Sequence, residues 1–257
     1  MWDPNQYALF SRQRSRPFHD LLARLRDRPA APVVDLGCGS GELTRLLAEL
    51  WPAAVVTGVD SSAEMLARAG EHAILGRLSW LRADIATWSS EQPVDLLFSN
   101  AALHWVPRHE VQIPRLAAMV APGGRFAVQM PNNFAQPSHQ TILAVAARDR
   151  WKNKLAPALE RPPGVMPLRW YAATMLAAGF GVDAWETEYL HVLHGDNPVR
   201  EWVRGTALRP LLNLLTTAEQ EAFLAEVGEE LARAYPPSGD LGTIFPFQRV
   251  FFVATRR

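Results

Sequence analysis

Cysteine is nearly absent from this chain of 257 residues, since Cys38 is the only one. A single thiol excludes an intrachain disulfide and any metal site built from several cysteines, and it favours a reducing, cytoplasmic location. The N-terminal residues 1–6 lack the basic segment and apolar run of a secretory leader, which agrees with that location. Long apolar runs are also missing, because none approaches the ~20 residues that span a bilayer. We therefore expect no membrane partner.

An excess of one charge is absent as well, since 26 lysines and arginines balance 26 aspartates and glutamates. A balanced chain has no global field to attract a polyanion, so no nucleic acid partner is expected. Lysine is rare, and nearly all the positive charge is carried by arginine. The histidines and carboxylates show no metal-ligand spacing, and we expect no metal site.

Short apolar runs alternate with helical patterns between Val33 and Met130. Alternation of this kind is typical of βαβ units around a parallel sheet. Ser61 and Glu64 are spaced as a capping box for the helix after the second run. The turn Pro122-Gly123-Gly124 precedes the fifth run. The predicted strands are 33–36, 55–59, 80–83, 96–98 and 125–128.

The rhythm changes beyond Met130, where prolines break the chain into irregular and short helical pieces. Strand signals return at 182–192 and 250–253, on either side of a mostly helical stretch, 197–235. We predict one α/β domain over 1–257, with a mostly parallel seven-stranded sheet and helices on both faces. Its parts are a cofactor-binding core (1–130), late strands (181–193 and 248–257) and two insertions (131–180 and 194–247) forming a helical cap above the carboxyl edge of the sheet.

A glycine-rich segment, Asp35-Leu36-Gly37-Cys38-Gly39-Ser40-Gly41, lies where the first strand passes into the first helix. Small residues in such a turn let a ligand approach the backbone closely. The dinucleotide fingerprint Gly-x-Gly-x-x-Gly would place its third glycine where this chain has Glu42, which argues against NAD.

Polar residues also close the next three strands. Asp60 ends the second strand, Asp84 follows the third and Asn100 closes the fourth. Open α/β sheets bind their ligands at the carboxyl ends of the strands. We therefore expect these side chains and the glycine segment to line one site.

The glycine segment resembles the acidic-x-Gly-x-Gly-x-Gly motif of class I methyltransferases, over about the first half of the chain. The resemblance implies a Rossmann-like fold and S-adenosylmethionine as cofactor, with S-adenosylhomocysteine as product. It assigns ribose hydroxyls to Asp60, the adenine amino group to Asp84, and the methionine part of the cofactor to Asn100. The implied cofactor-binding residues are Asp35, Gly37, Cys38, Gly39, Asp60, Ser61, Met65, Asp84, Ile85 and Asn100.

Segments along nearly the whole chain resemble trans-aconitate 2-methyltransferases. They are Trp2-Asp3-Pro4 with Tyr7, Arg14-Ser15-Arg16-Pro17, 103–107, 128–132, 201–206, Leu208-Arg209-Pro210 and Phe245-Pro246-Phe247. One departure is Arg204, where a lysine is common in relatives; both residues are basic. The resemblance implies methyl transfer to a carboxylate of trans-aconitate, a small polycarboxylate, giving a monomethyl ester.

A carboxylate acceptor explains why the sequence shows no catalytic triad. The carboxylate is already ionised at neutral pH, so positioning and water exclusion suffice, and no catalytic residue is predicted. Arginines suit the carboxylates that do not react. His104 and Trp105 are candidates for the wall of the transfer site, and Trp105 or Tyr7 for a cation–π contact with the sulfonium. The substrate-binding candidates are Tyr7, Arg16, His104, Trp105, Arg209 and Arg249.

Two alternatives remain open from the sequence. In the first alternative the chain is a methyltransferase with another small acceptor, because related methyltransferases modify a malonyl thioester, a quinone precursor or a natural product. The second alternative is a non-catalytic module that binds S-adenosylmethionine. The residues that argue against it are the intact Asp35, Gly37, Gly39, Asp60 and Asp84. Fold alone does not decide the substrate. A monomer or weak dimer is expected.

Overall fold

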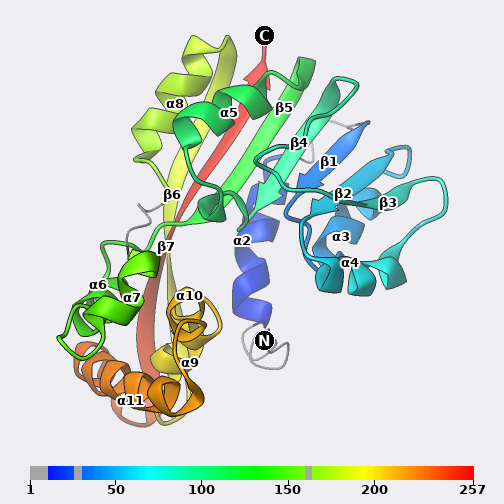
Figure 1. Ribbon diagram of the computed structural model, residues 1–257. Coiled ribbons are helices and arrows are strands. Elements are labelled where there is room, and N and C mark those ends of the chain that lie inside the picture. Colours follow the sequence, from blue (N-terminus) through cyan, green and yellow to red (C-terminus); the bar gives the residue numbers. More distant parts are fainter. Residues whose placement is uncertain (1–10, 26–30, 160–163) are drawn as a thin grey trace. The chain divides into compact units, whose positions relative to one another are not determined.

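The computed structural model describes residues 11–25, 31–159 and 164–257 (Figure 1). The chain divides into two compact units. We call residues 15–131, 164–187 and 249–257 the sheet unit, and residues 1–14, 132–163 and 188–248 the helical unit. The first predicted insertion, 131–180, is thus divided, because the part from Gly164 onward belongs to the sheet unit.

Seven strands form one sheet in the order β3-β2-β1-β4-β5-β7-β6. β1 pairs in parallel with both β2 and β4, whereas β7 runs antiparallel to β5. The predicted mostly parallel, seven-stranded α/β sheet is confirmed. The strands are β1 (Val33–Leu36), β2 (Val56–Asp60), β3 (Leu78–Arg82), β4 (Val94–Asn100), β5 (Val120–Pro131), β6 (Phe180–Leu193) and β7 (Thr243–Arg256).

Helices cover both faces of the sheet unit. On one face α5 (His109–Ala117) and α8 (Leu168–Ala177) lie beside each other, and Tyr171 of α8 stacks on Phe252 of β7. On the other face α2 (Ser11–Ala23) brings Phe18 to 5.4 Å from Phe98, measured between ring centroids. Alternate strand residues point to opposite faces, so each strand supplies both cores. The remaining helices of this unit are α3 (Glu42–Leu50), α4 (Ala63–Ala69), η1 (Gly70–His72) and η2 (Leu103–Trp105).

The start of α4 differs from the prediction. Ser62 is its N-cap, and the Ser62 hydroxyl accepts a hydrogen bond from the Met65 amide at 3.2 Å. Glu64 pairs with Arg68 one turn later instead of reaching back to the cap. The predicted capping box of Ser61 and Glu64 is therefore wrong, because the N-cap lies one residue later and places Met65, which lacks a carboxylate, at the third helical position. Either serine meets the local preference for an N-cap, and the β2–α4 connection decides between them.

The fifth strand begins earlier than the sequence predicts. Val94 pairs with Val120 but Leu96 pairs with Arg125, so extra residues of β5 are accommodated between these two pairs. Gly123 has a φ of 76°, which only glycine adopts readily. The segment Pro122-Gly123-Gly124 is thus an irregularity within β5 rather than a turn before it.

The helical unit has its own apolar core. Helix α11 contacts α6 and α9, and the ring of Trp202 lies among the rings of Phe245 and Phe247. Thr216 and Glu219 form a capping box at the start of α11. The helices are α6 (Pro137–Ala146), α7 (Lys152–Leu159), α9 (Pro198–Arg204), α10 (Arg209–Leu212), α11 (Thr217–Ala234) and η3 (Gly239–Leu241).

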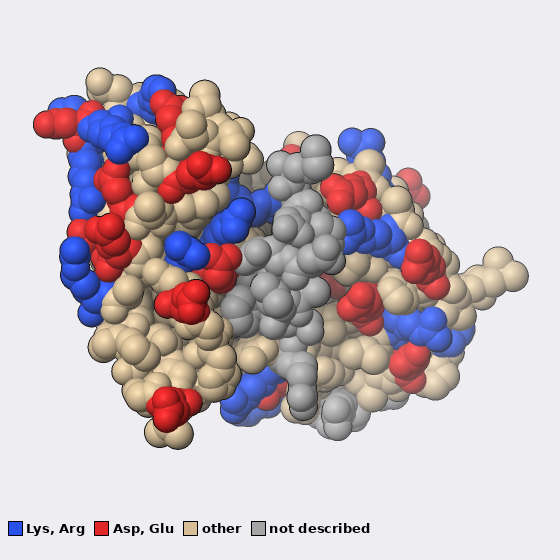
Figure 2. Space-filling view, turned by 90° about the horizontal axis from the view of Figure 1, so that it is seen from below, with Lys and Arg blue, Asp and Glu red and all other residues tan. Residues whose placement is uncertain are grey.

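Charged side chains of both signs are mixed on the surface drawn in Figure 2, where blue and red atoms alternate rather than gather by sign. This distribution agrees with the balanced composition. Among the described residues, no helix is both long enough and apolar enough to span a membrane.

Candidate active site

The strand order reverses at β1, which has β2 on one side and β4 on the other. Such a switch point leaves a crevice at the carboxyl edge of the sheet, because the connections on its two sides run to opposite faces. The glycine segment 37–41 follows β1, Asp60 ends β2 and Asn100 ends β4. The structure therefore brings these predicted cofactor residues to the same edge.

The glycine segment turns sharply and lies close to its neighbours. Gly37, Gly39 and Gly41 all have positive φ, at 78°, 56° and 82°. A Cβ on Gly37 would lie 2.1 Å from the Cβ of Ala102, whereas a Cβ on Gly39 would meet nothing within 4 Å. Gly37 is thus required for packing. The space in front of Gly39 is open for a ligand.

Asp60 connects the two loops on either side of this opening. One carboxylate oxygen accepts the Gly39 amide at 2.9 Å, and the other accepts the Ser62 amide at 2.8 Å. Each oxygen keeps a second lone pair, and the residue is half-exposed. Asp60 therefore orders both loops and retains acceptors for hydroxyl groups.

Asp35 is buried beneath the glycine segment, with only 4% of its surface exposed. Its carboxylate accepts a hydrogen bond from the Thr44 hydroxyl at 2.6 Å, which ties β1 to α3. Burial raises the pKa of Asp35 to about 7, opposed by the Thr44 hydrogen bond and reinforced by the charge of Asp60. Burial likewise raises the pKa of the Cys38 thiol, so the thiol stays protonated.

The turn after β3 forms another wall. Asp84 is exposed and its side chain accepts the Ala86 amide at 2.9 Å, while Ile85 is buried and its Cδ1 lies 3.7 Å from the position of a Cβ on Gly37. Arg115 of α5 donates to the carbonyl oxygens of Ile85 and Trp88. The sequence analysis missed Arg115, because an arginine on an amphipathic helix carries no local signal of this contact.

Asn100 closes β4 with an unsatisfied acceptor. Its Oδ1 is buried and has no hydrogen-bond partner among the described residues. The next residue, Ala101, has a φ of 53°, a conformation that is uncommon outside glycine, and its amide donates to the Gln129 carbonyl at 2.9 Å. Buried acceptors without a donor are rare, and this one lies at the edge where open α/β sheets bind their ligands.

His104 and Trp105 follow in η2, with their ring centroids 4.8 Å apart. Trp105 is 54% exposed, whereas His104 is half-buried. A Cβ on Gly164 would lie 2.3 Å from the His104 carbonyl oxygen, so this glycine packs directly on the η2 backbone. The exposed Trp105 ring is free to contact a ligand.

His109 contacts the backbone of η2 and the side chain of Tyr171 in α8. One ring nitrogen lies 2.9 Å from the Leu103 carbonyl oxygen, and the other lies 2.6 Å from the Tyr171 hydroxyl. The carbonyl requires a donor, so Nε2 carries the proton and Nδ1 accepts from the tyrosine. Burial lowers the pKa of His109, which keeps the ring neutral. Its role is to hold η2 against α8.

Gln129 and Arg249 form a buried polar pair at the end of β5. Both side chains are buried, at 0% and 5% exposure, and Arg249 Nη1 donates to Gln129 Oε1 at 3.3 Å. Arg249 was predicted from the sequence. Gln129 was not, because a single glutamine inside an apolar strand is indistinguishable locally from a satisfied core amide.

The other predicted substrate residues belong to different units. Arg16 is exposed on the part of α2 that belongs to the sheet unit, and Arg209 is half-buried at the start of α10 in the helical unit. Tyr7 lies outside the described residues. The roles of Arg16 and Arg209 stay predictions.

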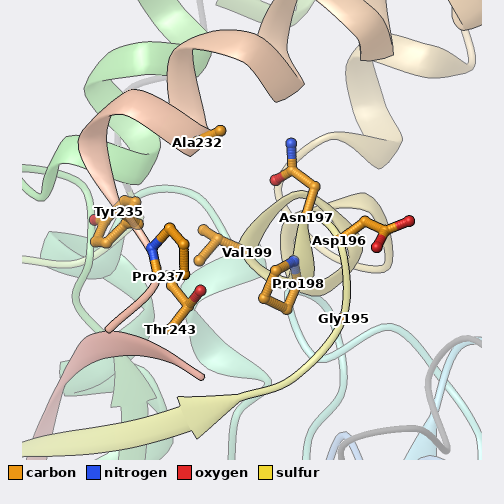
Figure 3. A pocket seen from close by; sticks show the side chains of 9 residues that line it. All are labelled: Gly195, Asp196, Asn197, Pro198, Val199, Ala232, Tyr235, Pro237 and Thr243. Carbon is orange, nitrogen blue, oxygen red and sulfur yellow. The ribbon is translucent and has the colours of Figure 1, made fainter. Parts of the chain in front are cut away.

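The distinct pockets lie elsewhere, in the helical unit. One of about 80 Å³ lies between the 195–199 segment and the end of α11, where Figure 3 shows Tyr235, Pro237 and Val199 around it and Asp196 pointing away. A second, of about 290 Å³, adjoins the same segment and is lined also by Gln13 and Glu201. No predicted site residue lines either pocket. Across the described residues, no three His, Cys, Asp or Glu side chains are grouped so as to hold a metal ion.

Comparison with known proteins identifies the family of this chain. Residues 33–124 match the family described as a methyltransferase domain. The chain is 48% identical to the trans-aconitate 2-methyltransferase of Streptomyces avermitilis, over 98% of this chain and 96% of that protein. It is 45% identical to the enzyme of the same name from Methylobacterium nodulans, over 99% and 98%. The chain belongs to the trans-aconitate 2-methyltransferase family.

Solved structures agree on the fold of this family member. The YcgJ protein of Bacillus subtilis superimposes with a TM-score of 0.60 at 16% identity, over 93% of this chain and 99% of that one. Phosphoethanolamine N-methyltransferase 2 of Haemonchus contortus, solved with S-adenosylhomocysteine, gives 0.53 at 17% identity, over 93% and 52%. The predicted class I methyltransferase fold is confirmed, and the protein is an S-adenosylmethionine-dependent methyltransferase.

The residues at the carboxyl edge fit that cofactor. Gly39 leaves open space at the backbone, and Asp60 retains acceptors beside it for ribose hydroxyls. The unpartnered Oδ1 of Asn100 suits the ammonium group of the methionine part. Asp84 and Ile85 lie on the turn predicted to hold the adenine. The assignment of individual atoms of the cofactor to these residues remains a prediction.

Proposed function

We propose that this methyltransferase transfers a methyl group from S-adenosylmethionine to a carboxylate of trans-aconitate, giving its monomethyl ester. The observation that carries the proposal is 43–48% identity, along nearly the whole chain, to relatives named trans-aconitate 2-methyltransferase. The insertions that distinguish one methyltransferase acceptor from another are included in that similarity, because it covers 98–99% of this chain.

The residues present suit an anionic acceptor. When bound, S-adenosylmethionine supplies an electrophilic methyl group on a sulfonium sulfur. A carboxylate accepts it without losing a proton, so the protein needs no general base. Arg249 is buried at this edge, where a guanidinium offers paired donors to a carboxylate that does not react. His104 and Trp105 form part of the wall, and Arg16 and Arg209 are the further candidates for the remaining carboxylates.

Methyl-transfer kinetics with three acceptors test the proposal. Turnover should be fastest with trans-aconitate, slower with citrate, whose tetrahedral centre differs from a planar alkene, and absent with an uncharged phenol. Equal rates on the phenol would refute a carboxylate acceptor while leaving methyltransferase activity intact. Chelators should not abolish activity, because the described residues group no three side chains that could hold a metal ion. Cys38→Ala should not abolish it either, because the Cys38 thiol is buried and protonated.

Arg249→Ala should lower kcat/KM for trans-aconitate by an amount equivalent to about 2–5 kcal/mol of transition-state stabilisation, because it leaves a desolvated carboxylate unpaired. Arg249→Lys should recover only part, since an ammonium lacks the planar fork. Calorimetry should show S-adenosylhomocysteine affinity within about twofold of wild type. An equal loss of cofactor affinity would instead assign Arg249 to the scaffold.

We further propose a cytoplasmic monomer or weak dimer that acts on a small polycarboxylate without nucleic acid or membrane partners. The balanced charge and the single cysteine support this proposal. Sedimentation at several protein concentrations measures the oligomeric state, and a concentration-independent dimer would contradict it.

A further inference from the structure

Gln129 presents a polar group that the described part of the protein does not satisfy. Its side chain is fully buried in β5, and its Nε2 has no hydrogen-bond partner among the described residues. A buried amide donor without an acceptor is costly, whereas an apolar side chain of the same shape avoids that cost. A glutamine at this buried position is therefore explained by a partner that arrives with a ligand.

The neighbouring arginine decides which end of the amide is available. Arg249 Nη1 donates to Gln129 Oε1 at 3.3 Å. Since a guanidinium offers only donors, the amide oxygen must face it, and the NH₂ group must point away. The orientation of Gln129 is thus set by a residue 120 positions later in the chain.

The register of the sheet places this donor beside the cofactor residues. Gln129 and Asn100 are direct neighbours across the β4–β5 pair, so their side chains emerge on the same face about 4.8 Å apart along the sheet. Within the part of the chain that the structure describes, Asn100 offers a buried acceptor without a partner and Gln129 a buried donor without one. The Asn100 acceptor suits a cationic group of a ligand, and the Gln129 donor suits an anionic group beside it.

We propose that Gln129 is a substrate-binding residue whose Nε2 donates a hydrogen bond to a non-reacting carboxylate of the acceptor, with Arg249 holding the amide in that orientation. The inference rests on the proposed function, because it specifies the acceptor subsite of the same reaction. Asn100 then faces the methionine part of the cofactor, and Gln129 faces the acceptor one strand away. The Gln129 amide donor beside the Arg249 guanidinium favours a ligand group that only accepts hydrogen bonds. An ionised carboxylate is such a group.

Two substitutions of matched size test this role. Gln129→Met keeps the shape but removes the donor, and it should raise the KM for trans-aconitate roughly 10- to 100-fold, since hydrogen bonds to charged groups are the strong ones. Gln129→Glu keeps an acceptor for Arg249 but places a negative charge toward the substrate, and its KM should rise further. Calorimetry should give S-adenosylhomocysteine affinity within about twofold of wild type for both.

Gln112→Glu is the matched control, because Gln112 also accepts a hydrogen bond from an arginine, Arg115 Nε at 2.9 Å, but on α5. It should leave the KM for trans-aconitate unchanged. An acceptor lacking one carboxylate, such as an unsaturated dicarboxylate, provides a second comparison. The Gln129→Met penalty should shrink with the acceptor that lacks the carboxylate bound by Gln129.

The outcomes separate the inference from the proposed function. Wild type that does not methylate trans-aconitate overturns both. Wild type that methylates it, with a folded Gln129→Met variant of unchanged KM, overturns only the role of Gln129. A parallel loss of acceptor and S-adenosylhomocysteine affinity also overturns it, since a merely structural residue gives that result. If Gln129→Met fails to fold, Gln129→Glu decides by the same two measurements.

Discussion

The sheet unit and the helical unit both carry surface ion pairs and both bury polar atoms without a partner among the described residues, but they differ in how those atoms are arranged. In the helical unit, Arg148 pairs with Glu226 at 3.0 Å and with Glu230 at 2.6 Å, all on side chains that water reaches. In the sheet unit, the atoms of Asn100 and Gln129 that lack a partner among the described residues lie on directly paired residues of β4 and β5, whereas the corresponding atoms of Asn133 and Trp151 in the helical unit do not lie on paired strand residues. Surface ion pairs contribute little to folding stability in water, whereas a buried polar group without a partner lowers it.

The difference separates stability from function. Parallel strands end together at one edge, so polar residues there converge on a ligand even when they are far apart in sequence. The helices of the other unit bury their apolar sides against one another and leave their charges outside. We therefore expect substitutions in the helical core to change stability first, and substitutions at the sheet edge to change binding first.

The largest expected effect on stability is in the helical unit. Trp202 is 1% exposed among aromatic rings, so Trp202→Ala should lower the free energy of unfolding by about 3–5 kcal/mol through cavity formation. Chemical denaturation measures this loss, with Trp202→Phe as the milder control. Cofactor affinity measured well below the transition should stay near wild type. A large drop in that affinity would remove the distinction between the units.

Asp35 makes the stability of the sheet unit depend on pH. Its pKa rises from 3.8 to about 7 on folding, so between these values the folded state binds a proton that the unfolded state does not. Stability contributed by the protonated carboxyl is present below pH 4 and is lost as pH rises toward 7, at about 1.4 kcal/mol per pH unit. Relative to Asp35→Asn, wild type should thus lose up to roughly 4 kcal/mol over this range.

Denaturant unfolding of both proteins at pH 4.5, 6 and 7.5 measures the difference. Asp183→Asn is the control, because Asp183 is exposed and pairs with Arg24 at the surface. Parallel stability curves for wild type and Asp35→Asn would show that burial does not perturb this carboxyl.

Asp60 tests the edge as a binding surface. Asp60→Ala removes a charged acceptor beside Gly39 and should weaken S-adenosylhomocysteine binding by about 1.5–3 kcal/mol. Asp196→Ala changes an exposed aspartate of the helical unit and should leave that affinity as it is. Calorimetry on both variants suffices, and equal affinities for wild type and Asp60→Ala would rule out the ribose assignment.

The smallest expected effect compares two glycines of the same conformation. Gly39 has a φ of 56° and Gly239 a φ of 58°, and a Cβ on either would meet nothing within 4 Å. Each Gly→Ala change should cost about 1–2 kcal/mol in unfolding free energy from the left-handed backbone. Only Gly39→Ala should also weaken S-adenosylhomocysteine, since its methyl group enters the ligand space. A similar loss for Gly239→Ala would contradict that reading.

Local patterns were sufficient for much of the sheet unit. The strand ends at Leu36, Asp60 and Asn100 follow from apolar runs that stop at polar residues, and the glycine spacing marks the ligand turn without any tertiary information. The same patterns misplaced the cap of α4, because Ser61 and Ser62 are both good N-caps and only the path of the chain separates them.

Contacts between distant segments were beyond the sequence. Arg115 reaches the turn after β3 across 30 residues, and His109 reaches Tyr171 across 62. Neither pair has a spacing that a local pattern encodes, since each depends on how a helix packs against the sheet. A single chain without its fold leaves such side chains as ordinary surface or core residues.

The amino-acid sequence by itself determined the order of strands and helices along the chain and the glycine turn, because hydrophobic periodicity and turn chemistry act within a few residues, and its resemblance to class I methyltransferases implied the cofactor. Only the tertiary structure decided that Gln129 meets Arg249, and that its amide donor lies beside the Asn100 acceptor, neither of which has a partner in residues 11–25, 31–159 and 164–257. That outcome depends on β7 entering the sheet antiparallel beside β5 in one register, and a shift of one residue would have turned Arg249 to the opposite face.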